Sequence, residues 1–149
     1  MAVTFKEVID FAIEKEKMSK AVYEKAVAVS KSPNVKVMFK EMAEEEDKHR
    51  KLLENLNEKN VAKYKIEKLP DLKISEFEAE VSFSPDMSYR DVLVMGMKSE
   101  EKSLALYKAM SEKSGDPQLK KLFDVLIQEE LKHKLKFEKE YDNVMFPDS

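Results

Sequence analysis

The chain contains no cysteine and no tryptophan, and only two of its 149 residues are glycine. The absence of cysteine excludes disulfides, zinc fingers, iron–sulfur clusters and thiol nucleophiles. No apolar run approaches the roughly 18 residues that a membrane-spanning helix requires, so we expect no membrane partner. The first ten residues lack the apolar core of a signal peptide, and we therefore expect a cytoplasmic protein.

The composition favours a helical, globular protein. Hydrophobic residues make up 42% of the chain and charged residues 38%, a balance typical of long amphipathic helices. The length suits a single domain that spans residues 1–149. The net charge is −3, and acidic and basic residues are interleaved without a basic stripe, so we expect no nucleic-acid partner.

The sequence repeats itself after 84 residues. Residues 5–57 and 89–141 align without a gap and are identical at fourteen of fifty-three positions. In each copy a proline follows a polar residue near the middle, at Pro33 and Pro117, and this pattern marks a turn followed by a new helix. Each copy is therefore predicted to fold as a helical hairpin.

Capping and turn residues set the expected boundaries of the four helices. Thr4 and Ser88 are predicted N-caps, and Gly115 is predicted to end the third helix. The helices are expected near residues 5–30, 33–58, 89–114 and 117–142. This pattern predicts an all-α four-helix bundle with hairpin one at 5–58, a long crossover at 59–87 and hairpin two at 89–142.

The crossover should not be structureless, because unstructured connections of this length are unusual in compact domains. We expect it to pack against the bundle and to include a short helix. Its apolar residues are Leu69, Leu72, Ile74, Phe77, Val81 and Phe83.

Ionisable residues interrupt the apolar row that each helix should turn toward the core. These rows step by three and four residues, as expected for one helix face. Neither lysine nor arginine stands in them, and small residues such as Gly96 would leave room for something other than side chains. The acids and histidines near the middle of the rows are Glu16, Glu46, His49, Glu100, Glu130 and His133.

Hairpin geometry predicts that these residues meet at one level. Glu16 and Glu46 are equidistant from the first turn, and Glu100 and Glu130 are equidistant from the second. Four buried carboxylates would repel one another and would be costly to bury without partners. Two divalent cations would neutralise them. Oxygen and imidazole donors without sulfur suit iron or manganese, with zinc as an alternative.

On these motifs the sequence resembles the ferritin-like di-iron carboxylate superfamily, and most closely its rubrerythrin branch. The resemblance covers all four predicted helices but not the crossover. The matching motifs are Glu16 with Tyr23, EEDKH at 45–49, Glu100 with Tyr107, and EELKH at 129–133.

The resemblance implies a ferritin-like bundle that holds two iron ions. Glu46 and Glu130 would bridge the ions. Glu16 and His49 would complete the ligands of one ion, and Glu100 and His133 those of the other. Tyr23 and Tyr107 would donate hydrogen bonds to the carboxylates without contacting the ions themselves, although as core aromatics they need no such role.

Two departures from the family pattern affect the expected function. Typical rubrerythrins carry a further glutamate three residues after the third-helix ligand, where this chain has Ser103. They also carry a cysteine-ligated rubredoxin module, which this chain lacks. We therefore expect an oxidoreductase of peroxide or dioxygen, active against oxidative stress, with electrons from an external rubredoxin-like donor or from Fe(II). The alternative is non-catalytic iron binding or storage, and the sequence leaves a homo-oligomer open.

Glu45 and Glu129 also recur in the two copies, directly before the predicted bridging residues. The apolar rows favour Glu46 and Glu130 as the inward residues. We therefore expect Glu45 and Glu129 to be exposed, although a pairing with the histidine four residues later is an alternative.

Overall fold

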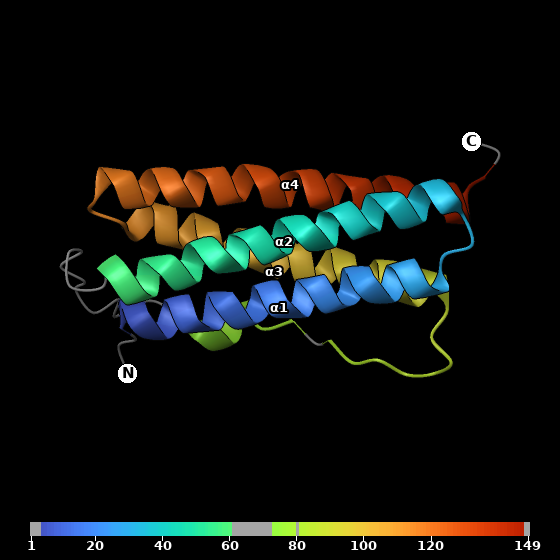
Figure 1. Ribbon diagram of the computed structural model, residues 1–149, viewed down its shortest axis with the longest axis horizontal. Coiled ribbons are helices and arrows are strands. Elements are labelled where there is room, and N and C mark those ends of the chain that lie inside the picture. Colours follow the sequence, from blue (N-terminus) through green and yellow to red (C-terminus); the bar gives the residue numbers. More distant parts are fainter. Residues whose placement is uncertain (1–3, 61–72, 80, 148–149) are drawn as a thin grey trace.

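The computed structural model describes residues 4–60, 73–79 and 81–147, and it is a four-helix bundle (Figure 1). The chain forms α1 (Phe5–Val29), α2 (Pro33–Asn60), α3 (Tyr89–Lys113) and α4 (Pro117–Met145). In Figure 1, α1 and α4 run in one direction along the bundle, and α2 and α3 run in the other. The predicted all-α fold is confirmed, and α4 extends three residues beyond its predicted end.

Local capping explains where the helices begin. The Thr4 hydroxyl accepts a hydrogen bond from the Glu7 amide, and Ser88 forms a complete capping box with Asp91. Asp116 accepts from two amides in the first turn of α4, before the proline at its first position. Gly115 does not have the positive φ of a glycine cap, so its predicted role in ending α3 is wrong.

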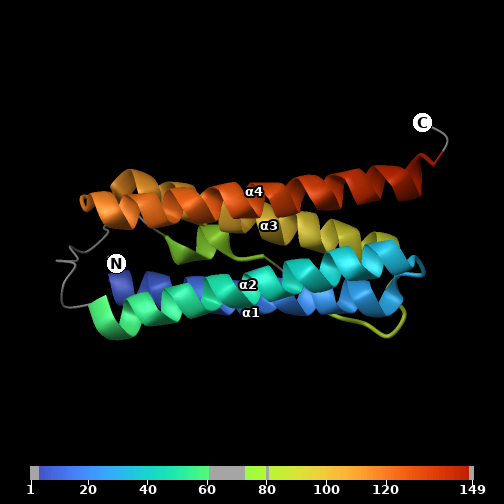
Figure 2. The same cartoon turned by 45° about the horizontal axis from the view of Figure 1, so that its top comes forward.

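The two hairpins pack as α1 against α2 and α3 against α4, and α1 also packs against α3. Figure 2 shows the hairpins as two layers. Their buried apolar side chains form two clusters. The first, near the start of α1, includes Phe5, Ile9, Leu53 and Phe123. The second, near the end of α1, includes Val22, Phe39, Leu93 and Phe137.

The crossover packs against the bundle in part as predicted. It contains a short 3₁₀ helix, η1 (Ile74–Phe77), which contacts α3. Phe77 is buried in the first apolar cluster, and Val81 packs against the second. Phe83 is 44% exposed, so its predicted packing is wrong. The predicted contacts of Leu69 and Leu72, and that of the Ile74 side chain, lie outside the described part of the molecule.

Gly96 serves the packing of an aromatic ring. A Cβ atom at this position would lie 2.4 Å from two ring atoms of Phe137. The ring of Phe137 itself packs against Tyr23 and Phe39, with centroid distances of 5.2 Å to both. The expectation that Gly96 leaves space for something other than a side chain is therefore wrong.

Across the described helices, none is both long and apolar enough to cross a membrane.

Candidate metal centre

The bundle brings the six ionisable residues of the apolar rows together at its centre. They come from all four helices, and none is more than 6% exposed. The two apolar clusters lie on either side of them along the bundle. The predicted convergence is therefore present in the structure, whereas the role of these residues as metal ligands stays a prediction.

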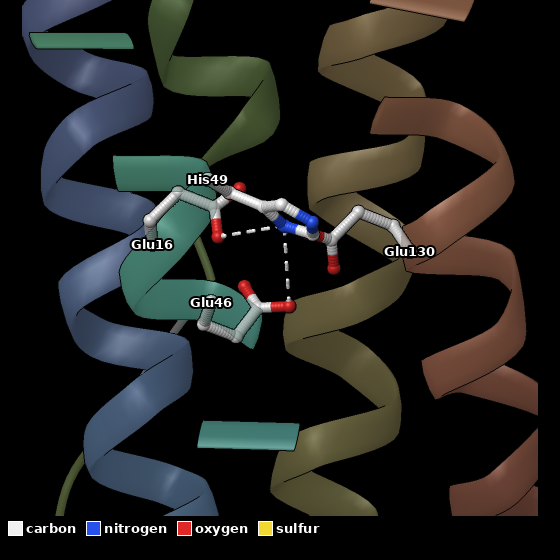
Figure 3. A group of neighbouring side chains, drawn as sticks. All are labelled: Glu16, Glu46, His49 and Glu130. Carbon is white, nitrogen blue, oxygen red and sulfur yellow. Dashed lines mark hydrogen bonds and ion pairs between the residues drawn. The ribbon is translucent and has the colours of Figure 1, made fainter. Parts of the chain in front are cut away.

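A first group of four side-chain oxygen and nitrogen atoms comes from Glu16, Glu46, His49 and Glu130, and these atoms all lie within 4.8 Å of one another. His49 directs Nδ1 into this group (Figure 3). This nitrogen lies 3.0 Å from Glu130 Oε1, 3.6 Å from Glu16 Oε2 and 3.7 Å from Glu46 Oε1. One imidazole nitrogen and three carboxylates thus surround a single point.

A second group comes from Glu46, Glu100, Glu130 and His133, again within 4.8 Å of one another. His133 Nδ1 lies 2.6 Å from Glu46 Oε1 and 3.7 Å from Glu130 Oε2. Glu46 and Glu130 belong to both groups. The two groups therefore share two carboxylates, which is the arrangement of a two-metal site in a helical bundle.

Two buried tyrosines hold the outer carboxylates. Tyr23 on α1 donates a hydrogen bond to Glu100 on α3, and Tyr107 on α3 donates one to Glu16 on α1. Each tyrosine thus links its hairpin to a carboxylate of the other. Burial raises the pKa of both phenols well above the usual value, so they remain donors. The contacts expected of Tyr23 and Tyr107 are present.

The carboxylates have more oxygen atoms than the described side chains can satisfy. Within the described structure, five buried oxygens of the four glutamates make no well-aligned hydrogen bond, including both of Glu46, although the His133 Nδ1 atom lies 2.6 Å from one of these two, Oε1. Buried polar atoms are normally paired, so this concentration of unpaired acceptors requires an explanation. Two divalent cations fit the donors, because oxygen and imidazole nitrogen are the ligands that iron, manganese and zinc share.

Without metal, the surroundings favour the protonated form of three of the four acids in this cluster. Burial raises the pKa of Glu16, Glu46 and Glu100, and the charge of Glu130 raises it further. Burial also opposes ionisation of Glu130, but the Glu100 carboxyl and the two imidazoles outweigh it and lower the pKa of Glu130. The opposite directions of these pKa shifts reduce the repulsion between the four carboxyls.

The surroundings favour the charged form of both imidazoles without metal. Burial disfavours the charged form of His49, but its interactions with Glu130 and Glu16 outweigh burial and raise its pKa to about 10. The pKa of His133 is likewise raised, against burial, by Glu130 and Glu45. Metal ions would therefore compete with protons for these groups.

Two interactions near the cluster were not predicted from the sequence, one made by Glu45 and one by Lys15. Glu45 was expected to be exposed, but its side chain is only 36% exposed and its Oε2 lies 2.7 Å from His133 Nε2. Lys15 is 4% exposed and donates to the Phe77 carbonyl oxygen at 2.8 Å. Lys15 lies beside the inward row of α1 and faces the crossover, so the row alone does not predict that this lysine is buried. Glu129 was also expected to be exposed, and its side chain is likewise half-buried, at 34% exposure.

Comparison with known proteins agrees with this geometry. A family model described as Rubrerythrin matches residues 7–141. A solved structure of a hypothetical protein from Pyrococcus furiosus has the same fold, with a TM-score of 0.71 over 94% of this chain and 89% of that chain at 22% identity. No curated protein matches the chain. Because the family model covers nearly the whole chain, including all six cluster residues, the chain belongs to the rubrerythrin family.

Proposed function

We propose that this protein is a di-iron oxidoreductase that reduces peroxide or dioxygen. The observation that carries the proposal is the pair of four-residue groups that share Glu46 and Glu130 and contain unpaired buried carboxylate oxygens. The electrons come from an external donor, such as a rubredoxin-like protein, or from Fe(II). When bound, the two iron ions supply the electron transfer to the oxidant.

The side chains of this protein would hold such a centre in place and shield it from bulk water. Glu16 and His49 would hold one ion, Glu100 and His133 the other, and the shared carboxylates both. The tyrosine hydroxyls fix the orientation of the outer carboxylates. The apolar clusters on either side exclude bulk water.

Iron is proposed over zinc because the reaction requires a change of oxidation state. Manganese can occupy the same oxygen and nitrogen donors and can also change oxidation state. Zinc fits the donors but cannot accept or donate an electron at this site.

The test is turnover per chain. Protein loaded anaerobically with Fe(II) receives hydrogen peroxide and an excess of a reduced rubredoxin-like donor. Many equivalents of peroxide consumed per chain support the proposal. The matched variant Glu130→Ala, which removes a residue of both groups, should lose both iron and turnover, whereas the exposed Glu44→Ala should retain both.

A single oxidation event per chain, followed by uptake of far more than two iron ions, would instead indicate iron storage. Storage in a cage also requires a large homo-oligomer, which light scattering would detect in the same samples.

A further inference from the structure

His133 uses both of its ring nitrogens, and it does so across the two hairpins. Its Nδ1 faces the cluster, 2.6 Å from Glu46 Oε1. Its Nε2 points the other way and lies 2.7 Å from Oε2 of Glu45, on α2. The His133 side chain is 0% exposed, so water does not reach Nε2. Glu45 is therefore the acceptor that satisfies a buried imidazole N–H.

The duplicated sequence predicts an equivalent contact for His49, but the structure does not form it. Glu129 occupies the position in the second copy that Glu45 occupies in the first. Its Oε1 lies 3.9 Å from Nζ of Lys132 on its own helix. In the described chain, no hydrogen bond or ion pair involves Nε2 of His49. Identical residues thus make different contacts in the two halves.

We propose that Glu45 positions His133 and thereby makes the two metal positions unequal, with the position formed by Glu100 and His133 binding its ion first and more tightly. This inference rests on the proposed metal centre. A carboxylate that accepts from one imidazole nitrogen fixes the tautomer, so the lone pair of the other nitrogen faces the metal. The carboxylate also orients the ring and makes the ligand nitrogen more basic. His49 has no such partner among the described residues.

The contact also links metal binding to the packing of the hairpins. Glu45 lies on α2 of hairpin one and His133 on α4 of hairpin two, so the hydrogen bond spans the two copies. The Glu45 side chain is 36% exposed, which keeps one side of the carboxylate in water and makes the residue replaceable without opening the core.

Zinc titration of the metal-free protein tests the proposal, because zinc needs no oxidant and remains diamagnetic. Isothermal titration calorimetry of the wild type should resolve a tight and a weaker site. Glu45→Ala should weaken the tight site about tenfold to a hundredfold. Glu129→Ala, the matched control in the other copy, should leave both sites unchanged. Glu45→Gln, whose amide oxygen can still accept a hydrogen bond, should give an intermediate loss.

The imidazole protons provide the second measurement. In zinc-loaded protein with ¹⁵N-labelled histidine, the Nε2–H signal of His133 should be protected from exchange with water. It should become fast-exchanging in Glu45→Ala but not in Glu129→Ala, whereas a merely structural role for Glu45 would change neither the tautomer nor the exchange. Assignment comes from His133→Ala.

Two equal zinc sites in the wild type, or equal losses in Glu45→Ala and Glu129→Ala, would overturn the inference while leaving the metal centre in place. Failure of the wild type to bind zinc at the cluster would overturn both. Normal unequal zinc binding without peroxide turnover would overturn the proposed reaction alone.

Discussion

Replacement of Glu46 by glutamine should have opposite consequences for stability with and without metal. Glu46 is 0% exposed, and neither of its carboxylate oxygens makes a well-aligned hydrogen bond, although His133 Nδ1 lies 2.6 Å from Oε1. Burial, then the charges of Glu130 and Glu16, raise its pKa well above the usual value. In metal-free protein, a neutral amide of nearly the same shape should be tolerated, and the melting temperature should stay the same or rise by a few degrees.

With metal, the same variant should lose most of the stabilisation. A ligand present at a hundred times its dissociation constant stabilises the folded state by about 2.7 kcal/mol, so two ions contribute about 5 kcal/mol. For a chain of this length, each kcal/mol shifts the melting temperature by about 2–4 °C, which gives a wild-type shift of about 10–20 °C. Because Glu46 belongs to both four-residue groups, Glu46→Gln should lose more than half of that shift.

The assay is differential scanning calorimetry with Mn(II) and, separately, with a chelator. The control is Glu44→Gln, a neighbouring exposed position that should behave as the wild type in both conditions. A Glu46→Gln variant that kept the full metal-induced shift would refute the role of Glu46 as a shared ligand. A variant that melted far below the wild type without metal would refute the claim that burying the Glu46 carboxyl destabilises the metal-free protein.

Three further changes have defined outcomes. Gly96→Ala should lower the free energy of unfolding by about 1–2 kcal/mol, as measured by thermal melts. The cost of packing the new Cβ against the Phe137 ring exceeds the gain in helix propensity. Lys15→Met should remove the donor to the Phe77 carbonyl oxygen and speed amide hydrogen exchange in residues 74–77 by about tenfold, measured by mass spectrometry. The stability of the metal-free protein should fall as the pH rises from about 6.5 to 10. The reason is that the pKa of His49 is raised from 6.5 to about 10, so its protonated form stabilises the fold. Thermal melts in chelator across this pH range test the prediction.

Each of these outcomes has a control. The double variant Gly96→Ala, Phe137→Leu should recover part of the stability lost in Gly96→Ala. If the changes in unfolding free energy of the two single variants simply added, the packing explanation would be contradicted. Unchanged exchange in Lys15→Met would show that the lysine does not hold the crossover. In saturating Mn(II) the pH dependence should weaken, because metal replaces the protons; the same slope with and without metal would contradict the proton displacement.

The features that the sequence predicted correctly are those set by local periodicity. Steps of three and four residues place Glu16, Glu46, Glu100 and Glu130 on inward faces, and a hairpin turn fixes their heights relative to one another. The prolines at the starts of α2 and α4 mark the turns directly. Convergence of the acids therefore followed from the pattern without knowledge of the packing.

The features that were missed depend on contacts between segments that are distant in sequence. Whether Glu45 reaches His133 depends on the offset between α2 and α4, which belong to different hairpins and which no turn relates. The burial of Lys15 depends on the path of the crossover over α1. The need for glycine at position 96 depends on the Phe137 ring that approaches from α4. Periodicity within one helix contains none of this information.

The most direct test of the metal centre is anomalous diffraction at the iron edge from crystals loaded with Fe(II) without oxygen. The geometry predicts two peaks per chain. One should lie beside Glu16 and His49, the other beside Glu100 and His133, with Glu46 and Glu130 in contact with both. No peak within the cluster, with the six side chains paired only among themselves, would contradict the centre.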